Sequence, residues 1–350
     1  MRKINKYVIL GFVGVLMLTG CKSNATSTET PIIPDETTIQ EELTSREEVN
    51  NDNVEYEGVY KLVTYTSYNQ NGEIYIITEH GYDKSGNEIL SKISVEDGGI
   101  IIYYKSEFDD YNRKIKVIDY EDETLINDYS TYEYDENSNL IKCEKYDGQN
   151  VLMEYYECTY DNKGNQLSIN YYKADGSKDG RITYEYDDKG NLIEEIEYDE
   201  NDVVKSTDIH EYNENFTKEK NMLYNSQGVM FGYYIYEYDE NHNKIMSALY
   251  DEDGVLDHRL ERQYNENNKI ISEKEYSDER GYYSIETFEY DDNGNLINEI
   301  SYDEDGNIIY LIVSEYNEDG DITKETHKKH NYVGDFVEVM YIKYEYQYSK

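Results

Sequence analysis

Two acidic loops are the part of this chain where residue type and spacing most suggest a chemical site. Asp251-Glu252-Asp253-Gly254 and Asp303-Glu304-Asp305-Gly306 each place three carboxylates before a glycine. Such oxygen ligands suit calcium, but the glycine comes too early for an EF-hand and the glutamate expected at its twelfth position is lacking. A tight turn explains the aspartates without metal. We expect weak calcium binding at the acidic turns at most, and no dedicated metal site.

The histidines do not form a recognisable ligand set. His80 and His210 stand two residues before an aromatic–acid pair, where Tyr184 stands in another copy, so we expect them to be members of an aromatic ladder. His242 falls in a turn, and His258 is isolated. The segment His327-Lys328-Lys329-His330 offers weak metal binding, but no cysteine–carboxylate cluster accompanies it, and a solvated loop is the simpler interpretation.

No catalytic motif stands out from the surface composition. Carboxylates are so frequent that a glycosidase-like pair cannot be distinguished from ordinary surface residues. The sequence contains no Ser-His-Asp arrangement, Gly-x-Ser-x-Gly elbow, Walker loop or dinucleotide fingerprint. We therefore expect no catalytic residue, no cofactor and no enzymatic activity, with a wall-polymer hydrolase as the alternative.

The N-terminus has the layout of a secretory signal. Three positive residues within 1–6 precede an apolar run over 7–18, which is shorter than the about 20 residues needed to span a bilayer. The run ends in Leu18-Thr19-Gly20-Cys21, which resembles the lipobox of bacterial lipoproteins. The resemblance implies lipidation of the Cys21 thiol with a diacylglycerol and cleavage just before it, giving stable anchoring through two acyl chains. A plain secretory signal with a chance cysteine is the alternative.

The sequence divides into three parts. Residues 1–20 are the expected lipoprotein signal peptide. Residues 21–57 comprise the lipidated cysteine and a disordered acidic tether, whose flexible part has an r.m.s. span of roughly 30–35 Å. Residues 58–350 are a β-repeat domain. We expect the mature protein to be anchored to the cell membrane, facing outside the cytoplasm.

The composition restricts the possible partners. The net charge is −43, and removal of residues 1–20, which carry three positive charges, leaves −46. Such a chain repels nucleic acid and anionic lipid surfaces, so cations, basic proteins and neutral glycans are the more plausible ligands. The 43 tyrosines argue against disorder despite the low hydropathy, because tyrosine supplies apolar area and favours strands.

Two cysteines, Cys143 and Cys158, lie in the repeat domain, where export would permit a disulfide. If residues 146–151 close a hairpin, Cys143 faces about Glu154 on the next strand. Cys158 then lies four residues further along, about 13 Å away at the rise of a strand, which is too far to bridge. We expect two free thiols.

A 26-residue repeat decides the expected fold. Tyrosine or phenylalanine followed by aspartate or asparagine recurs at this step, in a first series of anchors at Tyr82, Phe108, Tyr134, Tyr160, Tyr186, Tyr212, Tyr238, Tyr264, Tyr290 and Tyr316. A second series recurs at the same step, at Tyr68, Tyr120, Tyr146, Tyr172, Tyr198, Tyr224, Tyr250, Tyr276 and Tyr302, with Ser94 as its one interruption.

Each anchor opens a turn. Glycine or asparagine, which tolerate positive φ, usually stands four residues after the anchor. Phe216 and His242 replace it in two copies, and we expect those turns to differ. Segments such as Tyr184-Glu185-Tyr186 alternate between the turns with the period of a strand.

The repeat predicts an all-β protein. Two strands per copy give about twenty strands in one long antiparallel meander. Because wide sheets twist and curl, we expect a coiled or spiral sheet with the tyrosines turned inward. A flat single-layer sheet is the competing architecture.

The motif resembles a known repeat. Tyr184-Glu185-Tyr186-Asp187-Asp188-Lys189-Gly190-Asn191-Leu192 and Phe288-Glu289-Tyr290-Asp291-Asp292-Asn293-Gly294-Asn295-Leu296 are similar to the YD repeat of RHS-type bacterial proteins and teneurins. The resemblance implies a β-sheet that spirals into a hollow shell and a surface location. It implies no catalytic residue, and the repeats reach the C-terminus with no toxin segment after them.

The leading functional hypothesis is a non-enzymatic binding or adhesion scaffold of the cell envelope. Regularly spaced tyrosines with acidic neighbours can stack on sugar rings or grip a partner protein. A passive spacer, whose tyrosines serve packing alone, is the alternative beside the hydrolase. An exposed, contiguous tyrosine stripe would favour binding, and a buried ladder would favour packing.

Overall fold

The computed structural model describes residues 56–213, 217–277, 282–330 and 336–348, which contain strands and no helix. The chain divides into two compact units, Met1–Tyr56 and Glu57–Lys350. The expected signal peptide, Cys21 and most of the tether lie outside the described residues. Within the described ranges, no helix is long and apolar enough to cross a membrane.

The described residues form 22 strands, most of them seven to nine residues long. Their bounds are β1 (Lys61–Asn69), β2 (Ile74–Tyr82), β3 (Glu88–Ser94), β4 (Ile100–Phe108), β5 (Lys114–Tyr120), β6 (Ile126–Tyr134), β7 (Leu140–Asp147), β8 (Leu152–Tyr160), β9 (Gln166–Lys173), β10 (Lys178–Tyr186), β11 (Leu192–Tyr198), β12 (Val204–Tyr212), β13 (Lys218–Asn225), β14 (Met230–Tyr238), β15 (Lys244–Asp251), β16 (Leu256–Tyr264), β17 (Ile270–Ser277), β18 (Tyr282–Tyr290), β19 (Leu296–Tyr302), β20 (Ile308–Tyr316), β21 (Ile322–His330) and β22 (Phe336–Tyr348).

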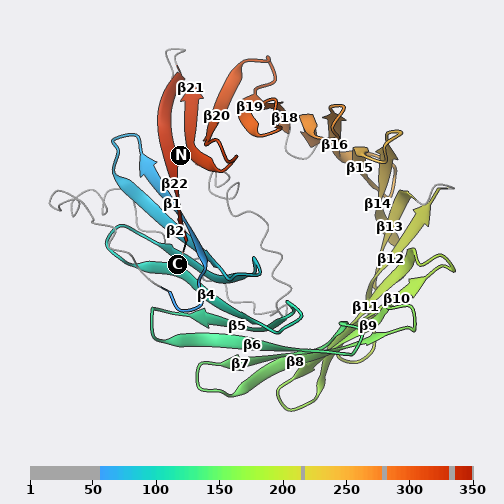
Figure 1. Ribbon diagram of the computed structural model, residues 1–350. Helices are drawn as coiled ribbons and strands as arrows, with labels where there is room; N and C mark the ends of the chain where they lie inside the picture. Colours follow the sequence, from blue (N-terminus) through green and yellow to red (C-terminus); the bar gives the residue numbers. More distant parts are fainter. Residues whose placement is uncertain (1–55, 214–216, 278–281, 331–335, 349–350) are drawn as a thin grey trace, which may run out of the picture. The chain divides into compact units, whose positions relative to one another are not determined.

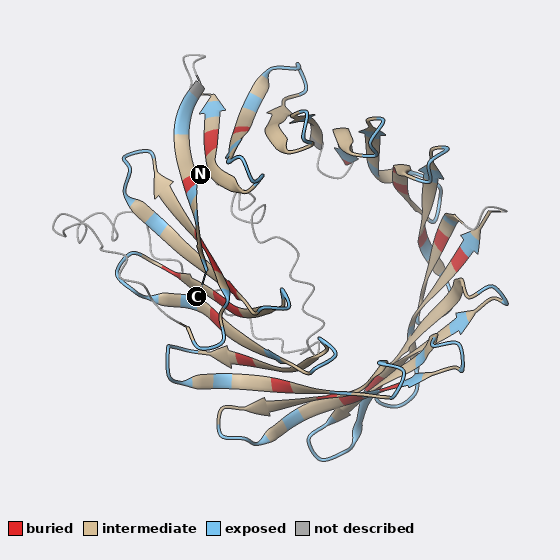
Figure 2. Ribbon diagram, in the orientation of Figure 1, coloured by how far each residue is buried: buried red, intermediate tan, exposed pale blue. Residues whose placement is uncertain are grey.

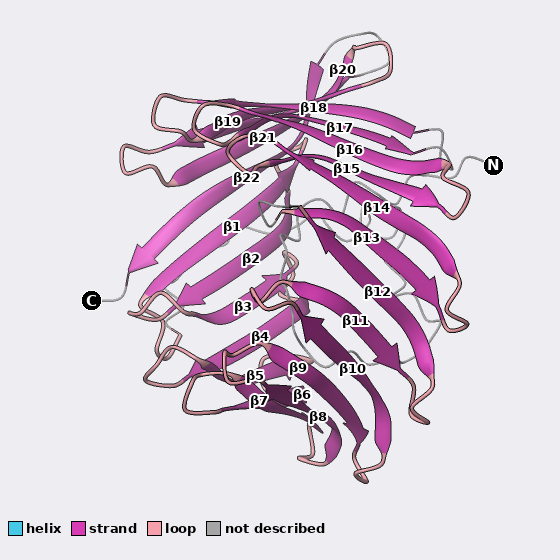
Figure 3. Cartoon of the chain, turned by 90° about the vertical axis from the view of Figure 1, so that its right-hand side faces the viewer, coloured by secondary structure: helices cyan, strands magenta, loops and turns pink. Residues whose placement is uncertain are grey.

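These strands make one closed antiparallel sheet. Each pairs with the next along the chain, as in the meander that the repeat predicts (Figure 3). The last strand, β22, then pairs with β1, in a register running from Lys61↔Tyr348 to Asn69↔Met340, so the sheet forms a ring (Figure 1). Closure satisfies backbone groups that an open sheet would leave at its two edges. The all-β prediction is confirmed, and the flat single-layer alternative is wrong.

Successive turns alternate between the two edges of this ring, which we call rims. The first rim is formed by the turns after Tyr82, Phe108, Tyr134, Tyr160, Tyr186, Tyr212, Tyr238, Tyr264, Tyr290 and Tyr316. The second rim is formed by the turns after Tyr68, Ser94, Tyr120, Tyr146, Tyr172, Tyr198, Tyr224, Tyr250, Tyr276 and Tyr302. The described chain starts and ends at the first rim, where Lys61 pairs with Tyr348.

The turns fall at the predicted Tyr-Asp steps, and the aspartate explains why. In the turn after Tyr186, the Asp187 Oδ1 atom accepts hydrogen bonds from the backbone N–H groups of Lys189 (2.9 Å) and Asn191 (2.8 Å). Its Oδ2 atom accepts one from the Asn191 side chain at 2.8 Å. Gly190 has a φ of 91°, a value that favours glycine. The carboxylate therefore closes the turn in place of backbone partners.

The expectation that the turn at His242 differs from the other turns is wrong. His242 has a φ of 63° and its N–H donates to the Asp239 carbonyl at 3.1 Å, as Gly190 donates to the Asp187 carbonyl. The turn at His242 therefore keeps the common geometry, with the side chain accepting a left-handed backbone. Phe216 lies outside the described residues.

The asparagine turns offer a test of this turn chemistry. Asn265 Oδ1 accepts hydrogen bonds from the N–H groups of Asn267 (2.9 Å) and Lys269 (3.0 Å). Replacing Asn265 with alanine should lower the free energy of unfolding by about 1–2 kcal/mol, because two donors lose their acceptor. Asn265→Asp, which restores the commoner residue, should be close to neutral. Urea titration of both variants checks this, and equal stabilities would contradict the assigned role.

The residue opposite Cys143 differs from the prediction, because the strand pairing shifts beside the anchor tyrosine. The β7–β8 pairing shifts between Lys145 and Tyr146, so Cys143 faces Tyr156 and not the predicted Glu154. Both Cys143 and Cys158 are buried, and neither is in a disulfide, as expected.

Burial is spread along the strands without one thick core. Most strand residues are half-buried, and the turns are exposed (Figure 2). Among the described side chains, His327 and Cys143 are the largest that are completely buried. The predicted solvated loop at His327-Lys328-Lys329-His330 is therefore wrong. These residues belong to β21, where His327 faces Ile312 on one side and Met340 on the other.

Candidate functional site

The histidines singled out in the sequence are scattered over the sheet. His80 Nδ1 lies 3.0 Å from the Glu88 carboxylate, and His258 Nε2 lies 2.9 Å from that of Glu275. His210 is buried within the sheet, which lowers its pKa by desolvation. Among the described residues, no group of three or more His, Cys, Asp or Glu side chains has the arrangement of a metal site.

The acidic loops use their first aspartate inside the turn. Asp251 Oδ1 accepts hydrogen bonds from the N–H groups of Asp253 (3.0 Å) and Val255 (2.7 Å). Asp303 Oδ1 accepts equivalent bonds from Asp305 and Asn307. These contacts give the aspartates a structural role, and calcium binding at the remaining carboxylates stays a prediction.

The first-series tyrosines hold neighbouring hairpins together. Their hydroxyl groups donate to the backbone carbonyl twenty residues earlier, at 2.7–3.0 Å. The pairs are Tyr134 to Lys114, Tyr160 to Leu140, Tyr212 to Leu192, Tyr264 to Lys244, Tyr290 to Ile270 and Tyr316 to Leu296. One copy is thereby fastened to the preceding one, so these side chains serve packing.

Second-series tyrosines stack on other tyrosines of the adjacent strand. Tyr129 and Tyr146 lie with ring centroids 4.9 Å apart and planes 11° from parallel, and Tyr155 stacks on Tyr172 at 4.7 Å. Lysines lie over these rings, as Lys116 does over Tyr129 at 4.8 Å. Among the tyrosines whose burial is described, the exposed ones are Tyr60, Tyr75, Tyr111, Tyr276 and Tyr348. Tyr60 and Tyr348 contact each other with ring centroids 6.1 Å apart, but the other three lie in separate strands or turns, so the five form no contiguous stripe. The regular ladder therefore acts in packing.

A groove opens at the seam where the two ends of the sheet meet. Its volume is about 620 Å³, and it lies at the first rim, between β1 and β2 on one side and β20–β22 on the other. It is lined by Tyr60, Lys61, Val63, Tyr65, Tyr82, Asp83, Lys84, Gly86, Tyr316, Gly320, Asp321, Ile322 and Tyr346. Five of these residues are tyrosines, which makes the groove an aromatic pocket with charged residues beside it.

Contacts across the seam hold the groove tyrosines in place. Tyr65 packs against Tyr344 with centroids 4.7 Å apart and against His80 at 5.3 Å. Tyr346 donates its hydroxyl to the Ile322 carbonyl at 2.9 Å, and Lys61 Nζ lies 5.0 Å from the centre of its ring. These contacts fix the walls before any ligand arrives, which reduces the entropy lost on binding.

The electrostatics of the groove suit binding better than acid–base chemistry. Burial raises the pKa of Tyr82 to about 12, with Glu88 adding to the effect, and burial likewise raises the pKa of Tyr346 to about 12. Their hydroxyls stay protonated at neutral pH. At Asp83, burial favours a higher pKa, but hydrogen bonds from the Asn87 side chain and from backbone N–H groups hold the pKa below its ordinary value. Asp83 is thus an ionised turn residue and a poor proton donor.

The sequence did not indicate this groove. Its residues come from 60–86 and 316–346, which lie at opposite ends of the repeat domain. The segment Tyr341–Tyr348 could have indicated one wall of the groove, since its tyrosines alternate with the period of a strand. Only the pairing of β22 with β1 brings the two sets together.

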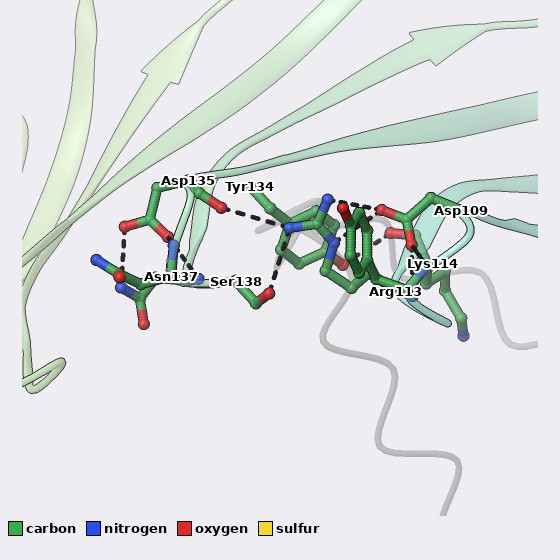
Figure 4. A network of polar contacts seen from close by, with 9 residues as sticks. Asp109, Arg113, Lys114, Tyr134, Asp135, Asn137 and Ser138 are labelled. Atoms are coloured by element: carbon green, nitrogen blue, oxygen red, sulfur yellow. Dashed lines mark hydrogen bonds and ion pairs between the residues drawn. The ribbon is translucent and has the colours of Figure 1, made fainter.

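Beyond the groove, the first rim is a continuous polar edge. Arg113 pairs with the Asp109 carboxylate at 2.7 Å in its own turn and reaches the Asp135 carbonyl and Ser138 Oγ of the next, each at 3.4 Å (Figure 4). Its guanidinium also lies 4.8 Å from the centre of the Tyr134 ring. Other adjacent turns are joined by single hydrogen bonds, from Asn87 to Asn112, Lys163 to Asp188 and Asn243 to Asn268.

Comparison with known proteins gives distant structural likeness only. No family model and no curated protein matches the chain. One similar solved structure, "Crystal Structure of TcdB2-TccC3-Cdc42", is 12% identical with a TM-score of 0.38, covering 78% of this chain. This chain spans 17% of its length. A porin-like protein from Bacteroides uniformis is 9% identical with a TM-score of 0.30, covering 84% of this chain and 99% of its own. Likeness at this level assigns neither a family nor an activity.

Proposed function

We propose that this protein is a lipid-anchored, non-enzymatic scaffold of the cell envelope that binds a glycan in the seam groove. The single observation that carries the proposal is the pocket of five tyrosines where β22 meets β1. Tyrosine rings offer flat apolar faces for sugar rings, and their hydroxyls and the neighbouring charges offer hydrogen bonds to sugar hydroxyls. A neutral glycan also avoids the repulsion that an anionic ligand would meet.

The anchor and the repeat class belong to this proposal. Cys21 would carry the lipid and hold the protein on the outer side of the cell membrane, with residues 21–57 as the tether. The repeats would be of the RHS/YD type, which the 26-residue step of Tyr-Asp turns supports. The proposal includes no cofactor and no nucleic acid, and weak calcium binding at the acidic turns remains a prediction.

A binding experiment with groove variants tests the glycan proposal. The intact chain would be applied to an array of neutral envelope oligosaccharides, and the best ligand titrated by calorimetry. Tyr60, which is 39% exposed at the groove, is the residue to replace, because its removal disturbs the fold least. Tyr60→Ala should weaken binding about tenfold, the equivalent of about 1.4 kcal/mol.

Tyr111→Ala is the matched control, since Tyr111 is 78% exposed in a first-rim turn outside the groove. It should leave the affinity unchanged. Equal loss in both variants would place the ligand elsewhere. If no oligosaccharide binds and a wall polymer is hydrolysed, the hydrolase alternative replaces the scaffold. Absence of both binding and hydrolysis favours the passive spacer, for which the packing role of the tyrosine ladder is the supporting observation.

A further inference from the structure

The second rim carries exposed apolar side chains at one repeated place. Val151, Val203, Val229 and Val255 are 55–59% exposed, and each directly follows the turn residue with positive φ. Leu125 is exposed at the same step of the repeat. Single exposed valines are ordinary, but five at one structural position form a pattern.

The geometry of the turn does not require an apolar residue there. At the first rim, asparagine occupies the same place in most copies, as Asn191 does, and its side chain adds a hydrogen bond to the turn aspartate. The backbone contacts are otherwise alike, since the N–H groups of Val255 and Asn191 donate to the turn aspartate at 2.7 Å and 2.8 Å. Folding alone therefore favours asparagine, and valine needs another explanation.

A second row of apolar residues continues the surface along the strands. Phe231 lies two residues after Val229, and Met153 two residues after Val151, and all four side chains are exposed. Neighbouring turns of one rim are separated by two strands, or about 10 Å. Val203, Val229, Phe231 and Val255 therefore lie close together across β12–β16, and we call these four residues the second-rim patch.

Two of the three turns at this patch are acidic, whereas the turn before Val229, residues 225–228, carries no charge. Asp199 and Glu200 precede Val203, and Asp251-Glu252-Asp253 precedes Val255. Four basic side chains among the described residues reach this region, and all are already paired with carboxylates. Lys173 lies 3.3 Å from Glu200, Lys205 lies near Glu197, and Lys178 and Arg181 lie 2.9 Å and 3.2 Å from Asp202. A second copy of this chain would bring like charges together, and an anionic lipid surface would be repelled. A ligand that is both cationic and apolar complements the surface.

We propose that the second-rim patch binds a basic amphipathic polypeptide, with its apolar side chains on the valines and Phe231 and its lysines or arginines on the turn carboxylates. This site is separate from the seam groove, which lies at the opposite rim. It gives the scaffold a second ligand class.

A model peptide tests the patch directly. The probe is a fluorescent leucine–lysine peptide that is apolar on one face, and its affinity for the intact chain would be measured by anisotropy at low and high salt. The rim variant is Val229→Asn, Phe231→Thr and Val255→Asn combined. The asparagines reproduce the first-rim turns, so the fold should be kept. Binding should weaken at least about tenfold in the variant and should weaken with salt in the parent.

Leu167→Asn, which removes an exposed apolar residue next to a first-rim turn, is the control and should bind the peptide like the parent. A peptide with glutamate in place of lysine should not bind. The proposal is overturned if the rim variant binds as tightly as the parent, if the acidic peptide binds equally well, or if sedimentation shows a dimer of the parent that the rim variant loses. The glycan titration is independent of all these outcomes.

Discussion

Deleting residues 336–350, which removes β22, is expected to convert the protein into an aggregating form, whereas deleting one whole 26-residue repeat should leave a folded monomer. The difference follows from whether the number of strands is even or odd. With 22 described strands, β1 and β22 run antiparallel and can close the ring. With one strand fewer, the ends would run parallel and the register of the closing pair would be lost.

The open form would expose two long edges. The outer backbone groups of β1 and β21 would lose their partners, and the Tyr65–Tyr344 contact would disappear with the deleted strand. Long, unprotected edges pair with other chains. Deletion of residues 161–186, which removes β9 and β10, keeps an even number of strands and joins two identical turn positions.

Size-exclusion chromatography with light scattering would distinguish the two deletions. We expect the β22 deletion to elute as oligomers or to precipitate. The repeat deletion should elute as a monomer and melt cooperatively at a somewhat lower temperature, because a smaller ring bends each strand pair more. If the β22 deletion is monomeric and as stable as the parent, closure contributes nothing to the fold.

The strands and turns could be predicted because their causes are local. Asp187 closes its own turn with its own carboxylate, and Gly190 supplies the positive φ within five residues. In the described first-rim turns an aspartate or asparagine repeats this chemistry, so the 26-residue step located the hairpins without knowledge of the tertiary structure. The exceptional turn at His242 follows the same rule, since the aspartate contacts tolerate a left-handed histidine.

Closure could not be predicted because it depends on the accumulated twist of all the strands. No single segment encodes how far each pair rotates, so the repeat favoured a curled sheet over a flat one without showing that the two ends of the sheet would meet. The seam groove depends on closure, and for this reason Tyr65 and Tyr346 could not be placed together from the sequence. His327 was misjudged for a related reason. Its lysine neighbours suggested a loop, but its burial is decided by Ile312 and Met340 on the flanking strands.

The stability of the closed sheet is expected to rise as the pH is lowered from 8 toward the ordinary glutamate pKa of about 4.3, and to fall again below it. Three carboxyls from neighbouring strands cause the rise. Burial raises the pKa of Glu286, of Glu299 and of Glu325, with Glu273 adding at Glu286, and Glu286 and Glu325 adding at Glu299. At Glu325 a hydrogen bond from Tyr344 partly opposes the shift.

The direction of this pH dependence follows from the linkage between proton binding and folding. A carboxyl with a higher pKa in the folded state takes up its proton more readily there, so protonation stabilises the fold. This contribution is complete below the unfolded pKa and is lost as the pH rises through the folded value. The nearby Arg262 does not cancel it, because its guanidinium is bonded to Glu273 at 2.7 Å.

Two other kinds of titratable group act against the three carboxyls and determine how the stability falls at acid pH. Hydrogen bonds from the turn lower the pKa of aspartates such as Asp187 and Asp239, so their contribution is present above the unfolded pKa and is lost as the pH falls through the lowered values. Burial lowers the pKa of His327 from 6.5 to about 4, so its contribution declines across that interval. We expect the three carboxyls and the net charge of −43 to outweigh His327 and also His210, whose pKa is likewise lowered by burial, until the turn aspartates protonate.

Thermal melts of the double variant Glu286→Gln, Glu299→Gln would test the carboxyl cluster. At pH 8 its melting temperature should exceed that of the parent by at least about 3 °C, because two buried charges are removed. The gain should shrink as the pH is lowered, because the parent carboxyls then take up protons in the folded state. Glu185→Gln, at an exposed strand position, is the control and should change neither the melting temperature nor its pH dependence. A double variant that melts like the parent at pH 8 would show that the clustered carboxyls are solvated well enough to ionise without destabilising the sheet.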